Sequence, residues 1–118
     1  MTETIKQLTN DILRFRDERD WEQFHTIKNL IISLNIEASE LLETVQWKKN
    51  DQVLESLKGA DGLEAIADEC ADVFIYLLLI CHECGIDLTD HTRKKISKNE
   101  TKYPVEKAFG SARKYTEF

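Results

Sequence analysis

Hydrophobic residues recur along the chain at the three- and four-residue spacing of amphipathic helices, and no stretch alternates as a strand would. Gly59 and Gly62 mark the clearest break in this pattern, and Gly85 is a natural helix stop. The fold class we expect is all-α, an antiparallel bundle of about four helices in a single domain, residues 1–118. The predicted helices cover residues 3–19, 26–48, 63–84, and a last segment from Asp87 or Thr89 to about Lys98.

The third predicted helix is apolar nearly all round between Val73 and Cys81, which is typical of a helix buried on every side. This run is far shorter than the ~20 residues that cross a bilayer, so we expect no membrane partner. A monomer of this length builds only a modest core. The sequence therefore predicts an obligate homo-oligomer, either a dimer or a tetramer built as a dimer of dimers, and we favour the tetramer.

The charge and the cysteine content of the chain indicate which partners the protein can bind and in which cell compartment we expect it. The net charge is −6 and the sequence pI is about 5.1, which argues against a nucleic-acid polymer as partner, because binding its phosphates needs a basic face. The amino terminus shows no secretory signal. Three cysteines within one apolar helix fit reduced thiols, and we expect a cytoplasmic protein.

Two pairs of carboxylates carry most of the chemical information. Glu37 with Glu40, and Glu69 with Asp72, each lie three residues apart in apolar helical stretches, so each pair projects from one helix face. Two carboxylates ~4 Å apart repel by on the order of 4 kcal/mol at an effective dielectric of about 20. On one straight helix Glu40 and Glu69 would lie about 42 Å apart. A turn near residues 59–62 lets the two acidic faces oppose each other.

Several explanations of these acids compete. The simplest is a pair of solvated acidic faces. A di-iron bundle would need Glu-x-x-His pairs, and neither motif has a histidine at its fourth position. Cys81 and Cys84 have the spacing of a zinc half-site but lack a second Cys/His pair, so packed thiols are the better interpretation. Oxygen-only ligands favour Mg²⁺, with Mn²⁺ as the alternative.

Other segments add to the acidic motifs, and together they resemble the all-α MazG-like nucleoside triphosphate pyrophosphohydrolases, in particular the compact subgroup that includes the dCTP pyrophosphatases. The resemblance extends over essentially the whole chain. It departs at Ile27, where relatives often carry proline. Its segments are Glu37-x-x-Glu40, Glu69-x-x-Asp72, residues 15–25 (FRDERDWEQFH), Lys28-Asn29-Leu30, Gln46-Trp47-Lys48, residues 102–105 (KYPV) and residues 110–115 (GSARKY).

The resemblance implies hydrolysis of a nucleoside triphosphate to the monophosphate and pyrophosphate, with dCTP or a modified dCTP as a candidate substrate and nucleotide-pool sanitation as the role. Mg²⁺ would be held by Glu37, Glu40, Glu69 and Asp72, and one carboxylate, for which we favour Glu40, would activate the attacking water. The rival predictions are a related pyrophosphatase for dUTP or phosphoribosyl-ATP and a non-catalytic helical interaction module.

Nine further residues are candidates for binding the nucleotide. Tryptophans stack on bases, the amino end of a helix favours anions, and a polar stripe at four-residue spacing could reach phosphate oxygens. For each residue a structural role is the alternative, such as an aromatic side chain in the core or a subunit interface, a capping amide or a solvated lysine. The candidates are Trp21, His25, Lys28, Asn29, Trp47, Tyr76, Lys95, Asn99 and Tyr103.

Overall fold

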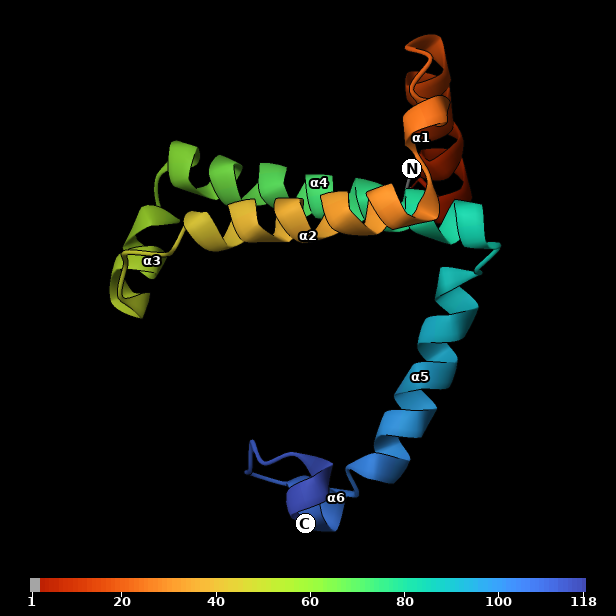
Figure 1. Ribbon diagram of the computed structural model, residues 1–118. Coiled ribbons are helices and arrows are strands. Elements are labelled where there is room, and N and C mark those ends of the chain that lie inside the picture. The colour runs from red at the N-terminus through yellow and green to blue at the C-terminus, as the bar shows by residue number, and fades with distance from the viewer. Residues whose placement is uncertain (1–2) are drawn as a thin grey trace. The chain divides into compact units, whose positions relative to one another are not determined.

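The computed structural model describes residues 3–118, and all regular elements in this range are helical, which confirms the all-α prediction (Figure 1). The chain divides into two compact units, one ending at Gly85 and one beginning at Ile86. The elements of the first unit are α1 (Ile5–Glu18), η1 (Glu22–Phe24), α2 (Ile27–Glu43), α3 (Asn50–Ser56) and α4 (Ala60–Cys84). Those of the second are α5 (Leu88–Lys102), α6 (Val105–Ala108) and η2 (Tyr115–Glu117).

The first unit is built on α2 and α4, which lie side by side and run antiparallel (Figure 1). Leu30 of α2 and Leu78 of α4 are almost completely buried, at 1% and 2% exposure, and form the centre of a small core. Helix α1 packs against α4 as well. The predicted antiparallel arrangement of the two acid-bearing helices is therefore present.

Side-chain caps fix where the helices begin. The Thr4 hydroxyl accepts a hydrogen bond from the Gln7 amide, and the Thr26 hydroxyl accepts one from the Asn29 amide. Helix α4 ends at Gly85, whose φ of 66° lies in the left-handed region that favours glycine. This stop confirms the sequence prediction.

The second helix is shorter than predicted. Helix α2 ends at Glu43 instead of continuing to Lys48. The Thr44 hydroxyl donates to the Leu41 carbonyl at 2.7 Å, and the amides that follow bond to carbonyls three residues back instead of four, which ends the α-helical pattern. A helix that we did not predict, α3, follows. Its start is held by the Lys49 amide, which donates to the Gln52 side chain at 2.8 Å.

The predicted start of the third helix at residue 63 is three residues too late, because α4 begins at Ala60. Gly59 is the N-cap of α4, and Gly62 lies inside the helix rather than before it. A Cβ at Gly62 would overlap the Ser56 carbonyl oxygen, so the missing side chain lets α3 and α4 approach each other. The glycine at position 62 thus serves close packing and not a turn.

The surface of the first unit keeps several large apolar side chains exposed. On α2 these are Ile27, Ile31, Ile32, Ile36 and Leu42, with exposures between 44% and 63%. Phe74 of α4 is also 38% exposed in the single chain, and the burial of this helix by a partner subunit stays a prediction. None of the helices in residues 3–118 is long and apolar enough to cross a membrane.

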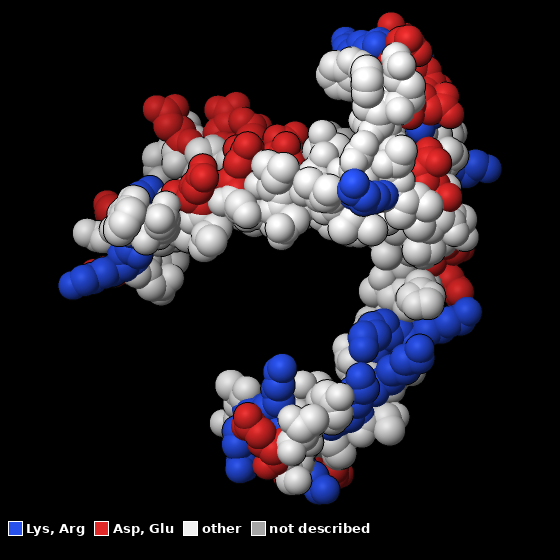
Figure 2. Space-filling view, in the orientation of Figure 1, with Lys and Arg blue, Asp and Glu red and all other residues white. Residues whose placement is uncertain are grey.

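The second unit is a basic helix followed by a folded tail. Helix α5 starts at the N-cap Asp87 as predicted but continues to Lys102, four residues beyond the expected end. Lysine and arginine side chains gather along it (Figure 2). After it, Tyr103 packs edge-on against Tyr115 and Phe118, with ring centroids 5.8 Å apart in both pairs.

Candidate metal and nucleotide site

The two acidic pairs come together on the facing sides of α2 and α4, as predicted. Carboxylate oxygens of Glu37, Glu40 and Glu69 all lie within 4.8 Å of one another. Asp72 is one turn beyond Glu69 on α4 and lines the same cavity as Glu37. We call these four residues the acidic cluster. In Figure 2, aspartate and glutamate side chains gather along the α2–α4 pair.

The acidic cluster is electrostatically strained. Burial, then the neighbouring Glu40, and then Asp72 and Glu69 raise the pKa of Glu37 to about 7. Burial and the Glu40 charge also raise the pKa of Glu69. Among residues 3–118, none of the four carboxylates has a Lys, Arg or His salt-bridge partner. The cluster therefore concentrates negative charge that the protein itself leaves uncompensated.

Two oxygens of the acidic cluster are enclosed and make no hydrogen bond within the described chain, Glu37 Oε2 and Glu69 Oε2. An enclosed oxygen without a partner is costly, and native structures rarely keep one without a role. A divalent cation would satisfy both oxygens and remove the repulsion. The donors are all carboxylate oxygens, which suits a hard cation such as Mg²⁺ or Mn²⁺ better than zinc. The residues present therefore fit a metal of this kind.

A cavity of about 230 Å³ adjoins the acidic cluster and shares two of its members. Its walls are largely apolar and aromatic, which is typical of a small-molecule site. Since an apolar cavity of about 150 Å³ accommodates benzene, this one has room for a six-membered ring with substituents. The lining residues are Ile12, Phe15, Arg16, Trp21, His25, Glu37, Asp72, Ile75, Tyr76 and Leu79.

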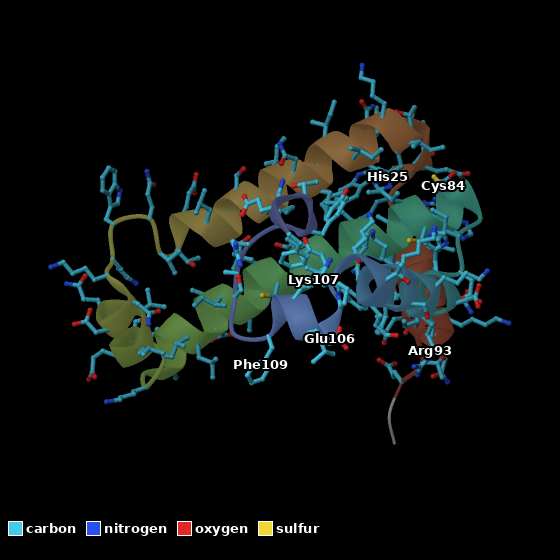
Figure 3. All side chains as sticks on the ribbon, turned by 90° about the horizontal axis from the view of Figure 1, so that it is seen from below. His25, Cys84, Arg93, Glu106, Lys107 and Phe109 are labelled. Carbon is cyan, nitrogen blue, oxygen red and sulfur yellow. The ribbon has the colours of Figure 1, made fainter. Side chains whose placement is uncertain are left out.

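Three predicted nucleotide-binding residues line this cavity: Trp21, His25 and Tyr76. The Trp21 ring stands edge-on to Phe15, with centroids 5.8 Å apart. His25 lies before the first residue of α2, close to α4 (Figure 3), and its ring centroid is 6.5 Å from that of Tyr76. Its Nδ1 atom is enclosed and without a hydrogen-bond partner in the described chain. Burial and the nearby Arg16 charge lower the pKa of His25, so its ring is neutral at neutral pH.

Other predicted residues of the first unit lie outside the cavity lining. Lys28 and Asn29 are exposed in the first turn of α2, and the Asn29 amide group donates to the Phe24 carbonyl at 3.1 Å. Trp47 lies in the turn after α2 and is 88% exposed. The structure thus brings Trp21 together with the acidic cluster but leaves Trp47 as a free aromatic surface.

The last three predicted residues belong to the second unit. Lys95 and Asn99 lie one turn apart on α5, and Tyr103 is its C-cap. The four-residue spacing therefore does form a stripe on a helix, because α5 extends to Lys102. Tyr103 is held by the aromatic tail rather than standing free in solvent.

Sequence reasoning assigned no role to Arg16, although it lines the cavity. Its side chain is only 6% exposed and forms ion pairs with Asp17, Glu22 and Glu83. The available signal was an arginine on the apolar stripe of α1 beside Phe15. Its partner Glu83 is distant in sequence, so the pattern alone could not identify the contact.

The chain is similar to known proteins in both sequence and fold. The MazG-like family model matches residues 32–118. The chain is 36% identical to human dCTP pyrophosphatase 1 over 97% of its own length and 67% of that protein, and 35% identical to the bovine dCTP pyrophosphatase 1 over 97% and 68%. A pyrophosphatase crystal structure from Archaeoglobus fulgidus superposes with a TM-score of 0.78 at 39% identity, covering 88% of this chain and 95% of that one.

Proposed function

The chain belongs to the MazG-like family and is a nucleoside triphosphate pyrophosphohydrolase, and from this premise we propose that it hydrolyses dCTP or a modified dCTP with Mg²⁺ held by the acidic cluster. The observation that carries the proposal is that Glu37, whose carboxylate lies within 4.8 Å of those of Glu40 and Glu69, also lines the aromatic cavity together with Asp72. A nucleotide whose base enters the cavity brings its phosphates to the carboxylates.

The acidic cluster is proposed to hold the metal through Glu37, Glu40, Glu69 and Asp72. Bound Mg²⁺ would neutralise charge on the triphosphate and polarise the α-phosphorus. The unpartnered oxygens of Glu37 and Glu69 support this assignment. Mn²⁺ has the same ligand preference and is the alternative metal.

Hydrolysis needs a group that accepts the proton of water. We assign this role to Glu40, whose carboxylate would orient the water and take its proton as the new bond to the α-phosphorus forms. The bond between the α-phosphorus and its bridging oxygen then breaks, and pyrophosphate leaves. The products are a nucleoside monophosphate and pyrophosphate.

The cavity is proposed to bind the base. Trp21 and Tyr76 offer aromatic surfaces, and base–aromatic stacking contributes ~1–3 kcal/mol per base. Neutral His25 presents its enclosed Nδ1 as a polar contact for the base edge. A cavity of about 230 Å³ suits a pyrimidine better than the larger purine ring system.

The remaining predicted residues complete the proposal as contacts with phosphate, sugar or base. For this reason we treat residues 1–118 as one functional domain, although the chain forms two units. In each unit the lysines could neutralise triphosphate oxygens and the uncharged polar groups could donate hydrogen bonds to the nucleotide, while exposed Trp47 could stack on a base. These residues are Lys28, Asn29, Trp47, Lys95, Asn99 and Tyr103.

We also propose a homo-oligomer, with a tetramer as the expected state, and a cytoplasmic location. The exposed isoleucines of α2 support self-association, because a partner subunit that covered them would remove large apolar side chains from water. Cys70, Cys81 and Cys84 are free thiols, which suits a reducing compartment.

The function is tested by incubating the protein with dCTP and Mg²⁺ and identifying dCMP and pyrophosphate. A panel of dCTP, 5-methyl-dCTP, dUTP, dTTP and ATP then measures base preference through kcat/KM. Glu37→Gln and Asp72→Asn should remove turnover while preserving helicity, and Glu64→Gln, on an exposed position of α4, is the matched control. Wild-type rates in both cluster variants would refute the metal assignment.

A further inference from the structure

Arg16 is the one charged residue of the described chain that is buried, and it lies at the wall of the aromatic cavity. Its Nε donates to Asp17 Oδ1 at 2.8 Å and its Nη1 to Glu83 Oε1 at 3.1 Å, while Nη2 lies 3.9 Å from Glu22 Oε2. A single cation therefore faces three carboxylates. These carboxylates come from α1, η1 and α4, so the guanidinium joins three elements that are separate in sequence.

The backbone of Arg16 holds the same region. Its carbonyl oxygen accepts hydrogen bonds from the Arg19 amide at 3.2 Å and from the Trp21 amide at 3.1 Å. Between them, Asp20 adopts a left-handed φ of 56°, which turns the chain sharply out of α1. The Trp21 backbone is therefore hydrogen-bonded to Arg16, and the side chain of Arg16 is in turn paired with Glu83 of α4.

We propose that Arg16 is a positioning residue for the nucleotide base, which acts by fixing the segment that carries Trp21 and His25 against α4. The inference rests on the proposed function of the cavity. A guanidinium suits this task because its planar, forked donors fix several carboxylates in a defined geometry, whereas an ammonium group is a flexible point charge. Arg16 thereby keeps the distance between the Trp21 side of the cavity and the Tyr76 side of α4.

The test combines kinetics with a spectroscopic signal that needs no substrate. The chain has two tryptophans, so in a Trp47→Phe background the fluorescence emission reports on Trp21 alone. Arg16→Lys keeps the positive charge but removes the planar, forked set of N–H donors. Glu83→Gln removes the negative charge from the Arg16 contact on α4 and so weakens that contact, at a side chain that is 30% exposed. Arg14→Gln, on the same helix with a side chain that is 70% exposed, is the matched control.

We expect both Arg16→Lys and Glu83→Gln to shift Trp21 emission to longer wavelength in the nucleotide-free protein. In the protein that retains Trp47, we expect the same changes to raise KM for dCTP by roughly tenfold, equivalent to about 1.4 kcal/mol, with kcat within about twofold. Arg14→Gln should leave the emission and KM unchanged.

The inference is overturned if folded Glu83→Gln keeps wild-type emission and KM, or if the variants lose kcat with KM unchanged. Glu83→Gln leaves the guanidinium paired with Asp17 and Glu22, so it decides the question even where Arg16→Lys fails to fold. If the wild-type protein does not hydrolyse dCTP, the proposed substrate fails, and the emission measurement still reports on the role of Arg16.

Discussion

Replacing Glu37 by glutamine should abolish activity and yet stabilise the metal-free protein. The pKa of Glu37 is raised from 4.5 to about 7, so the folded state holds this proton more tightly than the unfolded state. A raised folded pKa means that stability is greatest below pH 4.5 and is lost as pH rises through about 7. At pH 8 the ionised side chain therefore destabilises the fold, and an uncharged amide of the same shape removes that cost.

The magnitude follows from the size of the shift. At 1.36 kcal/mol per pKa unit, the ionised Glu37 side chain lowers the free energy of unfolding by at most about 3.4 kcal/mol. Glu37 is half-buried, and solvent screening reduces this to about 1–2 kcal/mol. For a domain of this size, each kcal/mol changes the melting temperature by about 4 °C, so Glu37→Gln should melt roughly 4–8 °C higher in EDTA at pH 8. Near pH 5 the difference should largely disappear.

The assay is thermal unfolding followed by circular dichroism, with and without saturating Mg²⁺. A ligand that binds only the folded state, at a concentration 100 times its Kd, stabilises that state by about 2.7 kcal/mol. Mg²⁺ should therefore raise the wild-type melting temperature at pH 8. It should have little effect on Glu37→Gln, which lacks one of the proposed ligands. Glu64→Gln is the control and should behave as wild type. If Glu37→Gln melts below wild type in EDTA at pH 8, the explanation from charge repulsion is wrong.

Three further outcomes are expected. Trp21→Ala should raise KM for dCTP by roughly 10- to 100-fold in steady-state kinetics, because ~1–3 kcal/mol of stacking is lost, and a KM within twofold of wild type would argue against base stacking there. Ile31→Glu should lower the molar mass measured by light scattering, since it places a charge on the exposed apolar face of α2, and an unchanged mass would locate the subunit contact elsewhere. Gly62→Ala should lower the melting temperature despite better helix propensity, because its Cβ would overlap the Ser56 carbonyl, and an unchanged or raised melting temperature would show that α3 adjusts without cost.

The acidic cluster was predictable because its geometry depends on simple rules. Three-residue spacing on a helix fixes which side chains are neighbours, and one antiparallel turn brings Glu40 and Glu69 together. Local periodicity also placed α1 and the stop at Gly85 to within two residues. These features depend on nearest neighbours along the chain.

The features that sequence reasoning missed depend on contacts between distant or very short segments. Helix α3 has seven residues, too few for a periodic pattern to stand out. The end of α2 is decided by one hydroxyl, that of Thr44, and this displaces Trp47 from the helix on which we expected it. The role of Arg16 could be predicted only from its contact with Glu83, which lies 67 residues further along the chain. Tertiary packing supplies that information, and single-sequence periodicity does not.

Gly85 marks a natural place to divide the molecule. All residues that line the cavity or form the acidic cluster precede it, whereas the basic helix α5 follows it. A protease that nicked the backbone here would release a fragment that keeps the acidic cluster and the cavity but lacks Lys95 and Asn99. Such a fragment would show whether the metal and base contacts proposed for the first unit survive without the side chains proposed to contact the triphosphate.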